Sequence, residues 1–144
     1  MNLNFSISEL CHSNVAKKYN IDNTPNIKIC DNLLLLIFNV LQPLRDNLGK
    51  PIIITSGYRC EKLNRHPEIN GALNSEHIRG YAVDFIVNKA KTEDVVNWVR
   101  KQNIKWTQLI DEHSKNTSWV HISYNPNNLK CEVLKYKNGM YSKL

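Results

Sequence analysis

Polar capping residues and the spacing of apolar positions predict that the chain begins with helices. Ser6 and Glu9 form a capping box, so a short helix is expected to begin directly after Ser6. A second helical segment is expected over residues 14–19. Turn-forming residues over 21–26 separate both segments from the next apolar stretch.

A long amphipathic helix is predicted over residues 32–48. Asp31 would cap its start and Gly49 would end it, while Pro43 is expected to kink it. Its apolar residues recur at intervals of three or four and are Leu33, Leu34, Ile37, Leu41, Leu44 and Leu48. This broad stripe indicates a helix that packs against the core.

Short β-branched or alternating runs in the rest of the chain predict a sheet. The expected strands cover residues 51–55, 81–87, 106–110, 119–124 and 130–136, and the Asn138-Gly139 hairpin turn leads to a short partner over 140–142. Thr92 is expected to cap a helix over 93–102. The predicted fold class is therefore α+β, with N-terminal helices packed on a small, mostly antiparallel sheet.

Two connecting segments and one strand bear on function. Residues 56–74 read as a long structured loop, and loops of that length inside a compact domain are usually functional or disordered. Residues 112–117 read as a polar loop between two strands. Along 81–87, alternation sends Asp84 to the face opposite Phe85, away from the large apolar residues.

Length and charge narrow the class of protein. The 144 residues are expected to form one domain over 1–144. Nineteen Lys and Arg against thirteen Asp and Glu give a net charge of +6, which favours anionic partners. The basic residues are scattered, without a Lys/Arg block or an Arg/aromatic repeat, so nucleic acid is not expected as a partner.

The cysteines and the hydropathy of the chain bear on its compartment. Cys11, Cys30, Cys60 and Cys131 are far apart and form no C-x-x-C pair, so reduced thiols are expected. The N-terminus lacks the basic region and apolar core of a signal peptide, and the longest apolar run, 33–38, is too short to span a bilayer. We therefore expect synthesis in the cytoplasm and no transmembrane segment, so that a target outside the cell must be reached by another route.

Two imidazoles and one carboxylate form the strongest chemical pattern. His77 and Asp84 flank Gly80, which permits a tight turn, and alternation turns His121 away from its apolar neighbours. Zinc binds His nitrogen and Asp oxygen, and its catalytic sites usually have three protein ligands and one open position. An ion in such a site polarises a carbonyl and acidifies water, so hydrolysis of a peptide or amide bond is the leading hypothesis.

At these residues the chain resembles the zinc peptidases that include D-Ala-D-Ala carboxypeptidases, the vancomycin-resistance dipeptidase and phage L-alanyl-D-glutamate endopeptidases. Their pattern is S-x-H-x-x-G-x-A-x-D followed by W-x-H or W-H, and it is filled by Ser75, His77, Gly80, Ala82, Asp84, Trp119 and His121. The segment 54–59, with Asn64 after it, is similar to the substrate-side segment of that family. The resemblance covers about residues 35–124.

The resemblance implies a fold shared with the Hedgehog signalling domain, one zinc ion and peptidoglycan stem peptides as substrate. His77, Asp84 and His121 would be the metal ligands. Arg59 would bind the carboxylate of the substrate, which suits a planar guanidinium, and Ser75 would donate a hydrogen bond to substrate near the metal.

One position departs from the pattern. Several relatives have the catalytic Glu or Asp three residues before the last His ligand, where this chain has Ser118. Glu112 is our candidate for the general base, because a loop between two strands can fold back over the site. Asp111 is the alternative, and alternation puts it on the opposite face. His113, beside the candidate base, is a candidate for stabilising an oxyanion.

Three functions remain open from the sequence. The first is a monomeric zinc peptidase of bacterial cell-wall peptides, either a carboxypeptidase or an endopeptidase, which is released during phage lysis or carried in a virion. The second is a zinc-stabilised module that binds wall peptide without cutting it, a reading that Ser118 favours. The third, a basic nucleic-acid adaptor, has no supporting motif.

Overall fold

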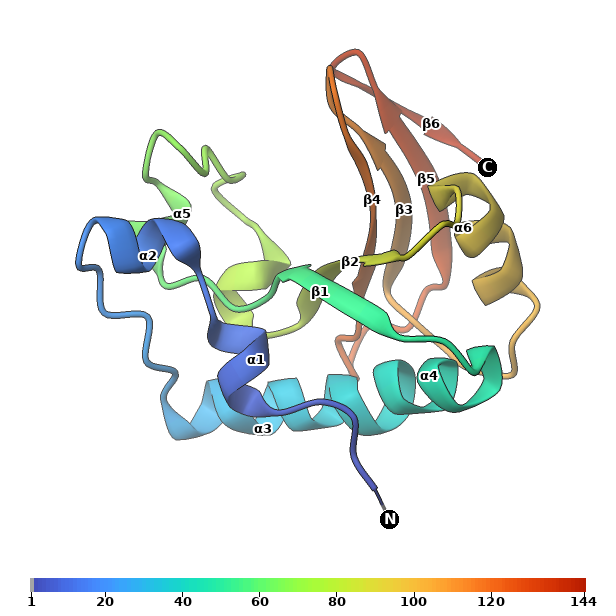
Figure 1. Ribbon diagram of the computed structural model, residues 1–144, viewed down its shortest axis with the longest axis horizontal. Helices are drawn as coiled ribbons and strands as arrows, with labels where there is room; N and C mark the ends of the chain where they lie inside the picture. The colour runs from blue at the N-terminus through green and yellow to red at the C-terminus, as the bar shows by residue number, and fades with distance from the viewer. Residues whose placement is uncertain (1) are drawn as a thin grey trace.

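The computed structural model describes residues 2–144 and has an α+β fold with a six-stranded mixed sheet, which confirms the predicted fold class (Figure 1). The helical elements are α1 (Ile7–Cys11), α2 (Asn14–Lys18), α3 (Ile27–Leu36), the π-helical turn η1 (Ile37–Leu41), α4 (Gln42–Leu48), α5 (Glu61–Asn64), the 3₁₀ turn η2 (Glu76–Arg79) and α6 (Thr92–Arg100). The strands are β1 (Ile52–Ser56), β2 (Ala82–Val87), β3 (Gln108–His113), β4 (Ser118–Ser123), β5 (Glu132–Lys137) and β6 (Met140–Lys143).

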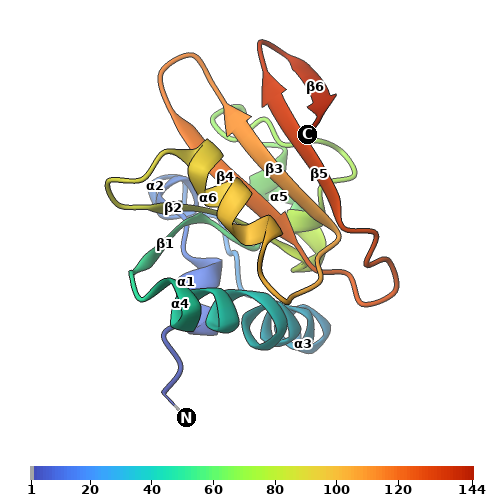
Figure 2. The same cartoon turned by 90° about the vertical axis from the view of Figure 1, so that its right-hand side faces the viewer.

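The order of strands across the sheet is β1-β2-β4-β3-β5-β6. Every neighbouring pair is antiparallel except β3 and β5, which are parallel. Helix α6 packs on one face of the sheet, and the continuous helix α3–η1–α4 runs beneath it (Figure 2). Among residues 2–144, only the short turn η2 is placed by the metal-site residues on the opposite face of β2, β4 and β3; this face, called the free face below, bears the chemical pattern.

Strand alternation separates the core from this free face. Val83, Phe85 and Ile122 are buried and belong to the same apolar cluster as the α6 residues Val96 and Val99. The residues between them on the strands, among them Asp84 and His121, therefore point to the other face. The predicted orientation of Asp84, opposite to the apolar residues of β2, is confirmed.

The long helix begins earlier than predicted. Asn26, not Asp31, is the N-cap, and its side chain accepts a hydrogen bond from the backbone N–H of Ile29 at 2.9 Å. The π-helical turn ends at Leu41, two residues before Pro43, which lacks the N–H needed for a regular turn. Gly49 ends the helix with a left-handed φ of 66° as predicted.

Most of the predicted apolar stripe faces the core. Leu33, Ile37, Leu41 and Leu44 are buried as predicted and Leu48 packs against them, whereas Leu34 is 38% exposed. Leu36 and Val40, outside the predicted stripe, are also fully buried. By length and composition the 22-residue helix over Ile27–Leu48 could cross a membrane, but it is also the helix that supplies much of the core.

Other boundaries need correction. The segment 56–74 contains the short helix α5, and Thr92 is the first residue of α6 instead of its cap. Strand β3 extends to His113, so only 114–117 connect it to β4, and Glu112 lies in a strand instead of a loop. Ser6 caps α1 as predicted, through a 3.1 Å hydrogen bond from the N–H of Glu9.

Candidate metal centre

Three elements bring the predicted ligands together. His77 lies in the 3₁₀ turn η2, Asp84 in β2 and His121 in β4. Asp84 and His121 are direct partners in the register of the antiparallel strands, and alternation points both to the free face of the sheet. Gly80 ends η2 with a left-handed φ of 72°, which turns the chain from His77 into β2.

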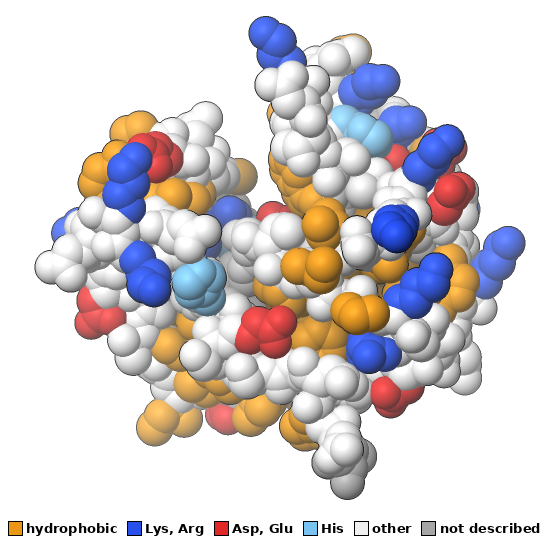
Figure 3. Space-filling view, in the orientation of Figure 1, with side chains coloured by type: hydrophobic (Ala, Val, Ile, Leu, Met, Phe, Trp, Pro, Cys, Tyr) orange, Lys and Arg blue, Asp and Glu red, His pale blue; other side chains and the backbone are white. Residues whose placement is uncertain are grey.

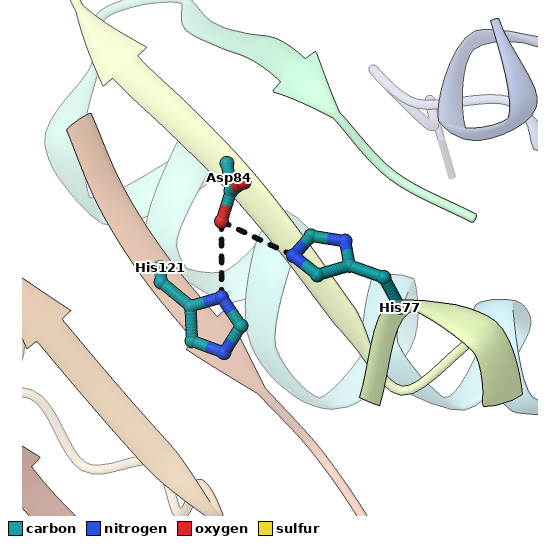
Figure 4. A group of neighbouring side chains, drawn as sticks. All are labelled: His77, Asp84 and His121. Carbon is teal, nitrogen blue, oxygen red and sulfur yellow. Dashed lines mark hydrogen bonds and ion pairs between the residues drawn. The ribbon is translucent and has the colours of Figure 1, made fainter. Parts of the chain in front are cut away.

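The three side chains converge on one point, as Figure 4 shows. Asp84 Oδ1 lies 3.0 Å from His121 Nδ1 and 3.3 Å from His77 Nε2. One donor atom from each residue lies within 4.8 Å of the other two, and all three side chains are nearly buried. Two imidazole nitrogens and a carboxylate oxygen so close together fit the donor preferences of zinc. Three protein ligands would leave the fourth coordination position of zinc for water or substrate.

A backbone carbonyl orients one of the imidazoles. His77 Nδ1 donates a hydrogen bond of 2.8 Å to the carbonyl oxygen of Gly57, which leaves Nε2 as the nitrogen that faces Asp84. Metal-binding histidines commonly hold their second nitrogen in this way. A side chain at Gly57 would overlap the backbone carbonyl of Leu10, so only glycine fits there without movement.

Charges within the cluster favour a cationic occupant. Burial opposes ionisation of Asp84, but the two imidazoles outweigh it and hold the pKa of Asp84 well below its usual range. Burial also disfavours charge on His121, yet the hydrogen bond and charge of Asp84 raise the pKa of His121 above its ordinary value. Burial lowers the pKa of His77. In the metal-free protein the Asp84 carboxylate therefore favours a proton on His121.

Glu112 lies next to this cluster. Its Oε1 is 3.8 Å from His121 Nδ1, because β3 pairs with β4 so that Glu112 stands opposite Trp119 on the same face as His121. Burial raises the pKa of Glu112, and the nearby carboxylate of Asp84 raises it further. The candidate base is thus brought to the site by a strand, whereas the sequence suggested a loop.

Asp111 and His113 point the other way. Asp111 is fully buried against α6, where Thr92 Oγ1 donates a 2.6 Å hydrogen bond to its Oδ1. His113 Nε2 lies 2.8 Å from the same oxygen. Alternation therefore excludes both Asp111 as the base and His113 as an oxyanion donor. Ser118 lies on that face as well, because it is an odd number of residues from His121.

Arg59 and Ser75 lie beside the ligands. Arg59 Nη2 donates to Ser75 Oγ at 3.4 Å, and Nη1 donates to Ser56 Oγ at 3.3 Å. Arg59 Nε is buried and has no hydrogen-bond partner among residues 2–144. Burial lowers the pKa of Arg59, although the carboxylates of Asp84 and Glu112 oppose that effect. The guanidinium therefore still has donor capacity for an anionic group.

All six predicted site residues line one open cleft of about 680 Å³, and they are Arg59, Ser75, His77, Asp84, Glu112 and His121. The hollow is visible in Figure 3, between the lobe that carries α5 and the lobe formed by β3 to β6. The sequence did not predict Tyr136 and Tyr141 as lining residues. Alternation along 132–136 puts Tyr136 on one face, but only the parallel pairing of β5 with β3 brings that face to the cleft.

This arrangement defines a class of protein: a His–Asp–His metal site with an adjacent carboxylate in an open cleft is typical of metal-dependent hydrolases. The family model described as Peptidase M15 matches residues 3–123, and the chain belongs to that family of zinc-dependent metallopeptidases. A search of curated proteins gave no match. The predicted resemblance is thereby confirmed at the level of the family, and a peptide substrate follows from it.

Proposed function

We propose that this protein hydrolyses a peptide bond in the stem peptides of bacterial peptidoglycan, as a D-Ala-D-Ala carboxypeptidase or an L-Ala-D-Glu endopeptidase. One observation carries the proposal most directly: the Glu112 carboxylate stands 3.8 Å from the His121 imidazole inside the cleft that holds all three ligands. A partly buried carboxylate with a raised pKa beside a metal site supports a role as general base.

In this proposal His77, Asp84 and His121 hold one zinc ion. The ion supplies a Lewis acid that polarises the scissile carbonyl and acidifies water. Glu112 accepts the proton of the attacking water and delivers it to the leaving nitrogen as the C–N bond breaks. The raised pKa of Glu112 suits this double role, because a carboxyl group that binds its proton more tightly both takes it up and keeps it for the leaving group.

Arg59 and Ser75 would orient the substrate. A stem peptide carries carboxylates, and the guanidinium of Arg59, which lines the cleft, can pair with one such group. Ser75 Oγ accepts from the N–H of His77 at 3.2 Å and is close to Arg59, so its own hydroxyl can donate to the same substrate segment. Both residues would thereby fix which bond lies over Glu112.

We further propose that the protein acts as a monomer at the bacterial cell wall, which it would reach on phage lysis or as part of a virion. Its net charge of +6 supports attraction to an anionic wall. Nothing in the cleft favours nucleic acid as a partner over a peptide.

The test is mass spectrometry of muropeptides after incubation of purified peptidoglycan with the zinc-loaded protein. The proposal expects new soluble products that disappear with a chelator and return with zinc, and their masses identify the bond. Binding to the wall at one zinc per chain without any product would instead support the non-catalytic wall-binding module. Inert protein that neither binds nor cuts peptidoglycan would contradict both.

A further inference from the structure

The C-terminal hairpin of β5 and β6 continues the sheet face that bears the metal centre. It lies outside the residues matched by the family model, which end at 123. Strand β5 pairs in parallel with β3, and Tyr136 is the register partner of Glu112. Residues that are partners in neighbouring strands share a face, so Tyr136 stands beside the candidate base.

Two tyrosines form a pair on this face. Tyr136 and Tyr141 are cross-strand partners, and their ring centroids lie 4.7 Å apart at an interplanar angle of 48°. Both line the cleft, and Tyr141 is 62% exposed. Hydrophobic side chains are visible on the wall of the hollow on the side of the hairpin (Figure 3). An aromatic pair held open to solvent beside a reactive site is suited to contact a ligand.

The pair lies toward the opposite side of the cleft from Arg59. Arg59 comes from the segment after β1, at one edge of the sheet, whereas the tyrosines come from β5 and β6, at the other edge. The metal ligands, on β2, β4 and η2, lie between them. Charge at Glu112 contributes, after burial, to a raised pKa of the Tyr141 hydroxyl, in keeping with a position on the same face as Glu112.

We propose that Tyr136 and Tyr141 form a substrate subsite that holds an apolar C–H face of the muropeptide, on the side of the scissile bond opposite to the part bound by Arg59. The inference rests on the proposed function of the cleft. Two parts of a muropeptide offer such a face: a sugar ring and an aliphatic side chain of the stem peptide. The rings would contact either one by packing, while the hydroxyls stay in water.

The test measures binding instead of cleavage. Two ligands are titrated by calorimetry into the zinc-loaded Glu112→Gln protein: a free stem peptide and the same peptide carrying the disaccharide. Tyr141→Ala and Tyr136→Ala, each added to that background, should weaken binding about tenfold, whereas Tyr141→Phe should leave it nearly unchanged. If the substitutions weaken binding of the disaccharide-carrying ligand alone, the tyrosines contact a sugar ring. If they weaken binding of both ligands equally, the tyrosines contact an aliphatic side chain of the stem peptide.

Met140→Ala is the matched control, because Met140 lies in the same strand, is 70% exposed and pairs with Lys137 on the other face of the hairpin. Affinity equal to that of the Glu112→Gln parent in both tyrosine-to-alanine variants would overturn the subsite, as would an equal loss when Met140→Ala is added to the same background. Wild-type protein that binds no muropeptide would overturn it too. If wild-type protein binds in this tyrosine-dependent way but yields no products from peptidoglycan, the subsite stands and the peptidase proposal fails.

Discussion

Glu112 is the residue whose chemistry separates a peptidase from a binding module. Its neighbour Asp111 also has a carboxylate, but that side chain is buried against α6 and accepts a hydrogen bond from Thr92. Strand alternation alone makes this distinction, and the sequence was sufficient to predict that the two residues point in opposite directions. The sequence was not sufficient to predict which face of the sheet bears the metal site, because that depends on the face against which η2 places His77.

Replacing Glu112 tests its role directly. Glu112→Gln keeps the shape of the side chain but cannot accept a proton, so kcat should fall by about a hundredfold or more while zinc stoichiometry is unchanged. Turnover is measured by release of muropeptide products, and zinc by metal analysis of the same sample. Glu93→Gln, an exposed glutamate of α6 on the far face of the sheet, should retain full activity. Equal rates in Glu112→Gln and wild type would assign the base to another group.

Gly57 links the packing of α1 to the metal centre. Its carbonyl holds His77 Nδ1, and its Cα faces the Leu10 carbonyl, which also accepts the N–H of Tyr58 at 2.7 Å. In Gly57→Ala the added methyl group forces this contact apart. We expect the free energy of unfolding to fall by about 1–3 kcal/mol and zinc affinity to fall roughly tenfold or more.

Denaturant unfolding and zinc titration measure both effects. Gly49→Ala is the control: Gly49 has a left-handed φ of 66° but open space around it, so this variant should lose stability and keep its zinc affinity. Wild-type zinc affinity in Gly57→Ala would show that the carbonyl of Gly57 does not position His77.

At the scale of elements, the parts of the site that could be predicted are those set by local rules. The turn at Gly80 and the alternation of β2 fix His77 and Asp84 within eight residues of one another. The hairpin of β5 and β6 could also be predicted, but its position could not. Tyr136 and Tyr141 reach the cleft because β5 pairs in parallel with β3. This pairing joins segments far apart in the sequence, and no local sequence pattern specifies it.

The attachment of α6 to β3 gives a prediction at this scale. The Thr92 hydroxyl at the first turn of α6 donates to the buried carboxylate of Asp111. Thr92→Val preserves shape but removes the hydroxyl donor and leaves His113 Nε2, at 2.8 Å, as the remaining polar neighbour of that buried oxygen, so the free energy of unfolding should fall by about 1–3 kcal/mol. Urea denaturation is the measurement. Thr117→Val, in the exposed turn after β3, should change stability by less than about 0.5 kcal/mol. If the two variants are equally stable, α6 is held by apolar packing alone.

The whole molecule should gain stability from zinc, because the ligands come from three separate elements that unfolding pulls apart. An ion that binds only the folded chain stabilises it by about 4 kcal/mol at a thousandfold excess over Kd. The thermal midpoint should therefore rise with zinc and fall back with a chelator. An unchanged midpoint across a wide range of zinc concentrations would argue against a folded-state metal site.

Protons should compete with that zinc in a defined way. Zinc needs neutral imidazoles, and in the metal-free protein the pKa of His121 is raised by Asp84 whereas that of His77 is lowered by burial. The ordinary histidine pKa of about 6.5 lies between the two, so near that pH the protonated form of His121 and the neutral form of His77 are favoured. Zinc binding there should release close to one proton, not two, and affinity should fall about tenfold for each unit by which pH is lowered. Calorimetry in buffers of different ionisation enthalpy counts the released protons. Release of two protons would show that both imidazoles are charged before zinc binds, and that burial does not keep His77 neutral.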